Sequence, residues 1–340
     1  MENKYSTELE PLPDNCLKLV LEHMELEKRE KLQYLFPIVR STLPYNLKSL
    51  TISDNYLEVN KREWTMGPLM KLIEERPNHE EGDLYEAVPN RTNVRFEMKG
   101  YRFIHEIDQD PGVAFNMLID EYLKNGTKIK KFKLYSCPQV IKDRDPETFK
   151  LSVEEVQCRN TTYGAFKDFL PFLDQSKPLK KIGFTFRNSN REFFDEPMVL
   201  KSEEIFLQFP YYDPDPMEDI LCTLPNKHIL MTYLDLPIVK IRELAAYWKK
   251  VRKPIGHTYS VVIENYIYVV EVFDDFKEHL GAIPSKRPEF KDNFFAHCAT
   301  IEIDEHSEIV VYGERAPIHW PPLIWALKME VMPRGATITK

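Results

Sequence analysis

The segment LDLPIVKIRELAAYWKKVRKPIGHTYSVVIE, residues 234–264, predicts a helix that leads directly into a strand. Proline suits the first turn of a helix, so we expect the helix to run from Pro237 to Val251. Its apolar residues recur at helical spacing, at Ile241, Leu244, Ala245, Trp248 and Val251. The run from His257 is rich in the β-branched and aromatic residues typical of strands. A helix followed by a strand is the repeating unit of an α/β fold.

Three similar apolar runs precede this strand. They are LKKIGFTF from Leu179, EEIFLQF from Glu203 and ILMTYLD from Ile229, and with HTYSVVIE they begin 24, 26 and 28 residues apart. A period of about 20–29 residues is typical of leucine-rich repeats. Alternating strands and helices predict a parallel sheet. We therefore expect an α/β (or α+β) fold in which residues 111–340 form an irregular, leucine-rich-repeat-like, open β/α array.

Other elements of this array are read from the same patterns. We expect further strands at IKKFKLYS (129–136) and LSVEEVQ (151–157), and helices at Val113–Lys124 and Tyr266–Leu280. Within residues 298–331, the runs ATIEID, EIVVYG and WALKMEV read as an antiparallel set. Such strands would cap the exposed edge of the sheet.

Residues 46–110 are expected to connect this array to the N-terminal part. NLKSLTISDNYLEV (46–59) predicts strands around a turn at Asp54-Asn55. Residues 66–75 are expected to form a helix, residues 76–93 a mobile polar loop, and residues 93–103 a strand or hairpin.

Residues 1–45 are expected to form a short helical head. The run LPDNCLKLVLEHMELEKREKLQYLFPIVR (12–40) resembles an F-box, the helical motif that docks a protein onto the adaptor subunit of a cullin-RING ubiquitin ligase. The resemblance implies an adaptor contact made by apolar residues of the head, namely Leu12, Pro13, Leu17, Val20, Leu21 and Leu35. The motif departs from the pattern at Pro37, which interrupts its third helix, and it lacks the usual tryptophan.

Further stretches resemble a large nematode-expanded family of F-box-like proteins of unknown function. They are LFPIVRSTLPYNLKSLTISDNYLEVN (35–60), NVRFEMKGYRF (93–103), residues 236–265 and WALKMEVMPRGAT (325–337). The resemblance implies intracellular protein recognition and supplies no reaction.

The composition narrows the class of partner. Lysine and arginine number 46 against 54 aspartates and glutamates, and the net charge of -8 argues against nucleic acid as the partner. The polar start and the lack of a long apolar run argue against a secretory signal and a membrane span. The five cysteines are scattered, so we expect reduced thiols and a cytoplasmic or nuclear location.

No motif of a known catalytic or metal-binding site occurs, so we expect no cofactor, no metal and no enzymatic activity. One carboxylate cluster lies in YYDPDPMED, at Asp213, Asp215, Glu218 and Asp219. It could hold a hard cation. A proline-rich turn whose acids favour the next helix N-terminus explains it better.

Lysines and arginines gather at three helix-to-strand junctions. The candidate basic rim consists of Lys130, Lys131, Lys180, Lys181, Lys249, Lys250, Arg252 and Lys253. In a parallel array such junctions share one edge, where they could dock an acidic or phosphorylated partner. Cations at helix C-termini are also favoured by the helix dipole alone, which is the simpler explanation.

Three hypotheses follow. The first is an adaptor that recruits an unknown substrate protein to a cullin-RING (SCF-type) ligase. The second is an interaction protein whose F-box-like head is purely structural. The third is an enzyme with an unrecognised site, which would require a deep pocket lined by titratable residues.

Overall fold

The computed structural model describes residues 20–21, 24–35, 44–74, 84–158, 163–185, 188–209, 222–232, 236–288, 297–320 and 323–339. The chain divides into two compact units. Unit 1 comprises Met1–Val153 and Lys167–Asp174, and unit 2 comprises Glu154–Phe166 and Gln175–Lys340. The fold is mixed α/β, as the sequence predicts, with parallel strands at its centre and antiparallel strands at both ends. The antiparallel C-terminal end was expected, whereas the antiparallel N-terminal end was not.

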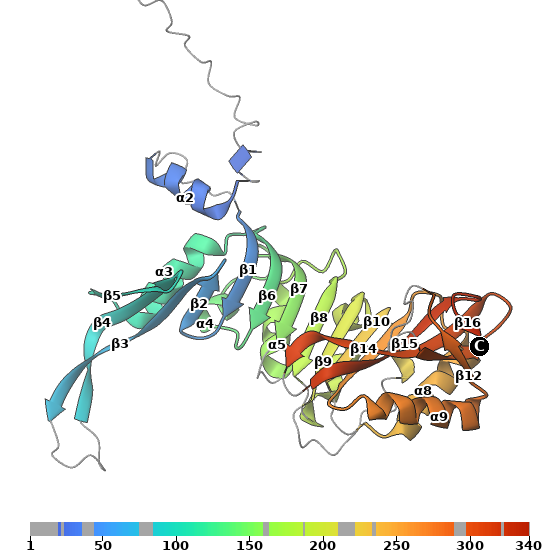
Figure 1. Ribbon diagram of the computed structural model, residues 1–340. Coiled ribbons are helices and arrows are strands. Elements are labelled where there is room, and N and C mark those ends of the chain that lie inside the picture. Colours follow the sequence, from blue (N-terminus) through green and yellow to red (C-terminus); the bar gives the residue numbers. More distant parts are fainter. Residues whose placement is uncertain are drawn as a thin grey trace, which may run out of the picture. The chain divides into compact units, whose positions relative to one another are not determined.

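Unit 1 contains a six-stranded sheet in the order β6-β1-β2-β3-β4-β5 (Figure 1). Strands β1 and β6 are parallel, and β1 to β5 form an antiparallel meander. Its strands are β1 (Asn46–Ile52), β2 (Tyr56–Val59), β3 (Arg62–Glu74), β4 (Leu84–Met98), β5 (Tyr101–Ile107) and β6 (Lys128–Leu134). Its helices include α2 (Leu26–Leu35), α3 (Pro111–Tyr122) and α4 (Gln139–Lys142).

The helix expected at residues 66–75 is wrong, because these residues belong to β3. The loop expected at residues 76–93 is wrong from Leu84 onward, where β4 begins, and residues 75–83 lie outside the described part. Pairing with β4 buries Met66, and this tertiary contact outweighs the helix propensity of the segment. The register shifts between Pro68 and Met70, which is how the ladder accommodates a proline.

Aromatic rings on one face of this sheet form a row with α3. The Trp64 ring centre lies 5.1 Å from that of Phe96 and 5.3 Å from that of Tyr122. Tyr122 in turn lies 6.0 Å from Tyr45, and Phe96 lies 6.2 Å from Phe103. Helix α3 begins where Asp110 accepts hydrogen bonds from the backbone of its first turn. Together with Phe115 and Ile119, which α3 also buries, these rings hold the helix on the sheet.

Unit 2 contains the expected parallel run. Most of β7 (Ser152–Cys158) belongs to it, followed by β8 (Lys181–Thr185), β9 (Glu204–Gln208), β10 (His228–Thr232) and β11 (Thr258–Ile263). Each of these strands is parallel to the next. The segments between these strands contain α5 (Tyr163–Phe169), η2 (Leu170–Phe172), η3 (Asn188–Asp195), α6 (Pro197–Leu200) and α8 (Ile238–Val251). One boundary between the units falls within α5, so its last residues and η2 belong to unit 1.

The two long helices of unit 2 match the sequence prediction. Helix α8 buries Ile241, Leu244, Ala245 and Trp248, and it packs against α9 (Ile267–Leu280) (Figure 1). Arg252 ends α8 in the left-handed conformation at φ 53°, and Gly281 ends α9 at φ 66°. None of the helices in the described residues combines the length and apolar character of a membrane span.

The closing strands are antiparallel, and they complete the open edge of the parallel run as expected. Strand β15 pairs with β11, and the order continues through β14, β13 and β12 to β16. Their bounds are β12 (Ile283–Lys286), β13 (His297–Glu302), β14 (Ser307–Trp320), β15 (Leu323–Pro333) and β16 (Ile338–Thr339). Their buried residues include Ile309, Val311, Leu327 and Met329.

Candidate partner-binding surfaces

The residues implied in adaptor binding are described only in part. Leu12, Pro13 and Leu17 and the side chain of Leu35 lie outside the described residues. Val20 is 47% exposed, whereas Leu21 is 3% exposed. Of the described pair, Val20 is therefore accessible to a partner and Leu21 is a core residue.

Helix α2 is fastened to unit 1 by charged and aromatic side chains. Glu30 accepts hydrogen bonds from Arg62 of β3 and from the hydroxyl of Tyr122 in α3, the latter at 3.0 Å. Burial and, after it, the Glu30 carboxylate raise the pKa of the Tyr122 hydroxyl, so it stays protonated and donates. The three side chains join α2, β3 and α3.

A second polar contact lies one residue earlier in α2. Arg29 is 1% exposed, and its Nη1 donates to the carbonyl oxygen of Pro44 at 2.7 Å. Its guanidinium carbon lies 4.1 Å from the centre of the Tyr45 ring, a cation–π geometry. A buried charge is tolerated only when it is paired or hydrogen-bonded in this way. Helix α2 is thus an integral part of unit 1.

In unit 2, two candidate residues of the basic rim lie at the start of β8. The first residues of β8 to β11 stand side by side in register, in the order Lys181, Glu204, His228 and Thr258. Lys181 is bonded to Glu204, and Nδ1 of His228 lies 2.8 Å from Oγ1 of Thr258. This edge therefore carries a lysine–glutamate pair and two further polar side chains rather than lysines alone.

The lysines that directly precede β8 and β10 are also paired with glutamates. Nζ of Lys180 donates to Glu154 at 2.7 Å, and this bond raises the pKa of the lysine. Lys227 lies 3.9 Å from Glu203. Surface pairs of this kind add little stability, but they neutralise the charge that an acidic partner would meet.

The cations at the end of α8 are in a different state. Lys249, Lys250 and Arg252 are exposed, and no ion pair within 4 Å joins them to another described residue. Hydrogen bonds from His306 and Ser307 lower the pKa of the Asp304 carboxyl, and the charge of Arg252 adds to this effect. Lys253 is half-buried, and its Nζ donates to the carbonyl oxygen of Leu224 at 3.0 Å. Burial lowers the pKa of Lys253. Lys249, Lys250 and Arg252 are therefore the available cations at this end of unit 2.

Lys130 and Lys131, the remaining members of the basic rim, belong to unit 1. Both are exposed and lie within β6 rather than at the junction before it. They follow one another between Ile129 and Phe132, which are buried.

The carboxylate cluster at Asp213, Asp215, Glu218 and Asp219 lies outside the described residues, within 210–221, shortly after β9 ends at Gln208. The described residues contain no cluster of three or more potential metal ligands.

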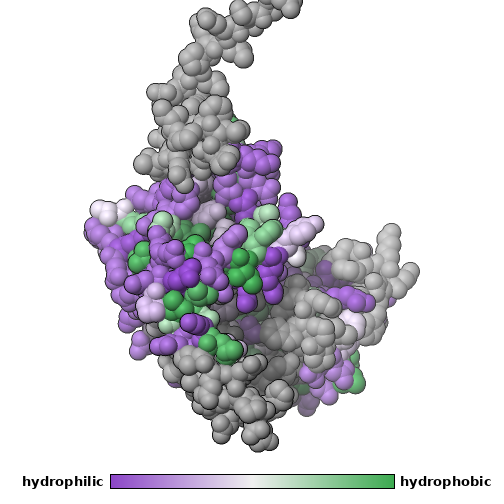
Figure 2. Space-filling view, turned by 90° about the vertical axis from the view of Figure 1, so that its left-hand side faces the viewer, coloured by the Kyte–Doolittle hydropathy of each residue, from purple (hydrophilic) through white to green (hydrophobic). Residues whose placement is uncertain are grey.

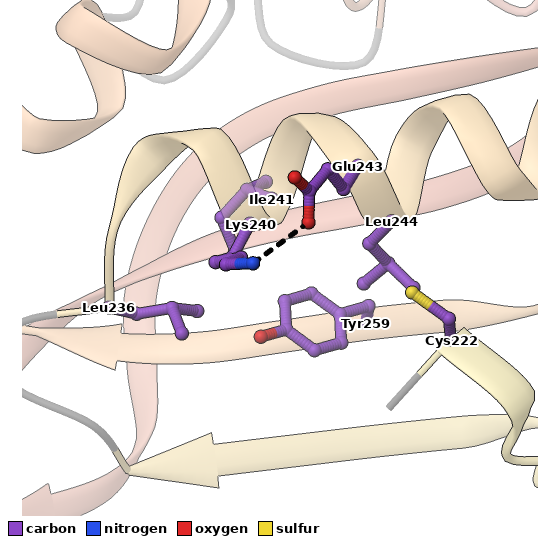
Figure 3. Close-up of a pocket in the computed structure, with 7 residues that line it drawn as sticks. All are labelled: Cys222, Leu236, Lys240, Ile241, Glu243, Leu244 and Tyr259. Atoms are coloured by element: carbon purple, nitrogen blue, oxygen red, sulfur yellow. Dashed lines mark hydrogen bonds and ion pairs between the residues drawn. The ribbon is translucent and has the colours of Figure 1, made fainter. Parts of the chain in front are cut away.

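A small hollow lies between α8 and the sheet of unit 2 (Figure 3). Its lining consists of Cys222, Leu236, Lys240, Ile241, Glu243, Leu244 and Tyr259. The empty space is about 270 Å³, counting the solvent at its mouth, below the roughly 300–1,000 Å³ of typical ligand pockets. Lys240 and Glu243 are bonded to each other at 3.1 Å, and the Tyr259 hydroxyl donates to the sulfur of Met231. The remaining lining is largely apolar.

The described cysteines fit the expectation of reduced thiols. Cys137, Cys158 and Cys298 are buried cysteines, and Cys222 is a partly exposed one. Burial raises the pKa of Cys137 to about 12, which keeps it protonated and unreactive at neutral pH.

Comparison with known proteins gives a match to the model of a family whose function is not known. The model of a family described as a domain of unknown function, DUF3557, matches residues 110–265. This region begins at the N-cap of α3 and ends just after β11, and it amounts to less than half of the chain. The F-box is not matched. No curated protein and no solved structure gives a significant match.

Proposed function

We propose that this chain is a non-enzymatic protein-interaction protein that recruits substrate proteins to a cullin-RING (SCF-type) ubiquitin ligase. In this proposal the F-box-like head contacts the adaptor subunit through Leu12, Pro13, Leu17 and Val20. The parallel strands β7 to β11 act as an irregular, leucine-rich-repeat-like recognition array. The observation that carries the proposal is the 47% exposure of Val20, together with a helix α2 that Arg29 and Glu30 anchor to unit 1.

Such anchoring suits an adaptor because a ligase must hold its substrate at a defined distance from the transfer site. A head that is fixed by buried polar contacts holds the substrate at a more constant position than a head on a flexible linker does. The same anchoring is what a purely structural head would require. The two versions therefore differ at Val20 and the residues before it, and not at α2.

Affinity purification of the full chain separates these versions. We expect wild type to co-purify the adaptor subunit, and the variants Leu12→Ala/Pro13→Ala and Val20→Asp to lose it at unchanged melting temperature. Lys31→Asp is the control, because Lys31 is exposed on α2 but lies outside the contact. Wild type without adaptor, or adaptor retained by both head variants, would favour the structural head.

A second interaction is supported at the end of α8. Lys249, Lys250 and Arg252 are exposed and outside ion pairs with described residues, whereas Lys180, Lys181 and Lys227 are paired with glutamates. Within the recognition array, the α8 cations are therefore the better place for an acidic or phosphorylated segment of the substrate.

A further inference from the structure

Strand β5 is the last strand of the unit 1 sheet. It pairs with β4 from Tyr101 opposite Met98 to Ile107 opposite Thr92, without a register shift. Within the described part of the chain, no strand pairs with its other side. Residues 101–106 are all exposed. The outer backbone groups of β5 therefore form an open template for another strand.

Natural proteins usually blunt such an edge with proline, a bulge or charged side chains, above all lysine. Strand β5, whose sequence is YRFIHEI, has no proline, bulge or lysine, and its two charged side chains, Arg102 and Glu106, are opposite in sign. Instead, the strand exposes large apolar side chains: Tyr101 is 69% exposed, Ile104 57% and Phe103 46%. Figure 2 faces the side of the molecule on which β5 and α3 lie in Figure 1, and it shows apolar patches among hydrophilic residues.

The sequence of β5 is complementary to itself when two copies run antiparallel. With the two-fold axis at Ile104, that residue faces Ile104 of the second copy. Arg102 then faces Glu106 of the second copy, and Phe103 faces His105. Tyr101 faces Ile107 at the ends. Opposite charges and apolar pairs that face each other across two strands are stabilising, whereas like charges are not.

The charged groups of β5 are accessible for this pairing. The Arg102 and Glu106 side chains are 59% and 52% exposed. Within the chain, Arg102 lies 3.1 Å from Glu97 and Glu106 lies 3.6 Å from Arg91. A second copy would extend these pairs into a row of alternating sign: Glu97, Arg102, then Glu106 and Arg91 of the second copy.

We propose that β5 is a homodimerisation strand, which pairs antiparallel with β5 of a second copy about a two-fold axis at Ile104. An unrelated extended peptide could also add to an open edge. The second copy is favoured because the charges are opposite in sign and equidistant from Ile104, as an isologous contact requires. The contact is small, so we expect a reversible dimer rather than an obligate one. This inference does not depend on the proposed function.

A charge swap tests the register. Sedimentation velocity of the full chain, from low micromolar to several hundred micromolar, should show wild type passing from monomer to dimer. Arg102→Glu or Glu106→Arg alone places like charges face to face twice in the dimer, and each should raise the dissociation constant by about tenfold or more. The double variant Arg102→Glu/Glu106→Arg should recover the wild-type constant.

A wild-type dissociation constant in the double variant would show that the effect comes from the contact between the two copies and not from contacts within one chain. In the double variant, the glutamate introduced at position 102 lies beside Glu97 and the arginine introduced at position 106 lies beside Arg91, so the contacts within each chain are worse than in wild type. Lys130→Glu is the matched control, because it reverses an exposed charge on β6 of the same unit. It should leave the dissociation constant unchanged.

Cross-linking tests the position of the axis. In the proposed dimer the two copies of residue 104 are directly opposed, with Cα atoms at the separation that a disulfide accepts. Under mild oxidation Ile104→Cys should give a covalent dimer, and Arg95→Cys, on the same face but one strand inward, should not. A wild type that stays monomeric at every concentration, a charge swap without recovery, or no cross-link at residue 104 overturns the proposal.

Discussion

The hydroxyl oxygen of Tyr122, in α3, lies 3.0 Å from a carboxylate oxygen of Glu30, in α2, although 92 residues separate them in the chain. Arg62 of β3 bonds to the other oxygen of the same carboxylate. The sequence of α2, LEKREKLQYL, has few apolar residues with which to bury a face. Besides the buried Leu26, helix α2 is therefore held on unit 1 by polar contacts that can be removed one at a time.

Removing the Tyr122 hydroxyl should weaken this anchor. Tyr122→Phe keeps the ring but leaves one oxygen of Glu30 without its buried donor. We expect the free energy of unfolding to fall by about 1–2 kcal/mol, measured by urea denaturation. Tyr85→Phe is the control, because Tyr85 is 52% exposed. Equal stability of the two variants would show that the Tyr122 bond contributes nothing.

Gly313 of β14 should not tolerate alanine. A Cβ atom built at Gly313 would lie 2.3 Å from Cε2 of Tyr266, whose ring is in edge contact with Trp325 at 5.4 Å. Because the ring has a packed neighbour, we expect Gly313→Ala to cost about 1–3 kcal/mol. Gly67→Ala is the matched control, since a Cβ at this strand position meets no atom within 4 Å. The cost of Gly313→Ala should shrink in a Tyr266→Ala background, and a cost that persists there would argue against the clash.

Much of the sheet was predictable because its signals are local. The strands β8 to β11 are short apolar runs at a regular period, and α8 and α9 carry clear apolar stripes. Strand β3 was mispredicted because Met66, Leu69 and Met70 suit a helix as well as a strand. Pairing with β4 makes this segment a strand rather than a helix, and local periodicity carries no information about that partner.

The polar anchor of α2 could not be predicted from the sequence. Arg29 in the run LEKREKLQYL reads as a solvated charge, yet it is 1% exposed. Its burial depends on the Pro44 carbonyl and the Tyr45 ring, which the fold brings to it. The symmetric charges of YRFIHEI are visible in the sequence, but the position of β5 at a sheet edge is not.

His257 should make the protein less stable in mild acid. Burial lowers the pKa of its imidazole below the ordinary 6.5, although its bond to the Pro254 carbonyl opposes the shift. Between the lowered pKa and 6.5, the unfolded chain binds more protons than the folded one, so stability falls as the pH falls from about 6.5. Urea denaturation at pH 7.5 and pH 5.5 should show a smaller loss for His257→Gln than for wild type.

The control for this comparison is His306→Gln, because the His306 side chain is 82% exposed. It should lose as much stability in acid as wild type does. If His257→Gln behaves like His306→Gln, the acid sensitivity arises elsewhere in the protein.

The carboxylates Asp213, Asp215, Glu218 and Asp219 should not form a metal site. We expect the quadruple alanine variant to melt within a degree or two of wild type, because acids that favour a helix N-terminus typically contribute only about 0.3–1 kcal/mol each. A cation that binds only the folded state would raise the melting temperature. Wild type should therefore melt at the same temperature in millimolar calcium, millimolar magnesium or EDTA. A rise with either cation that the quadruple variant lacks would identify a metal site.

The cations at the end of α8 should act in association rather than in folding. We expect Lys249→Glu/Lys250→Glu/Arg252→Glu to slow binding of an acidic partner, with a smaller effect as salt is raised, because exposed charges are screened over about 8–10 Å at physiological ionic strength. Lys253→Glu should instead destabilise the fold, because Nζ of Lys253 is bonded to the Leu224 carbonyl in a half-buried position.

The control separates partner binding from the helix dipole. Lys277 occupies the last turn of α9 as Lys249 and Lys250 occupy that of α8, and it is exposed. Reversing the charge of Lys277 should lower the free energy of unfolding by about 0.3–1 kcal/mol through the helix dipole, and it should leave the association rate unchanged. The association rates of the α8 triple variant and of the Lys277 variant would be measured with partners recovered by affinity purification. If the α8 triple variant loses stability but associates with the partner as fast as wild type, these cations serve only to complement the dipole at the end of their helix.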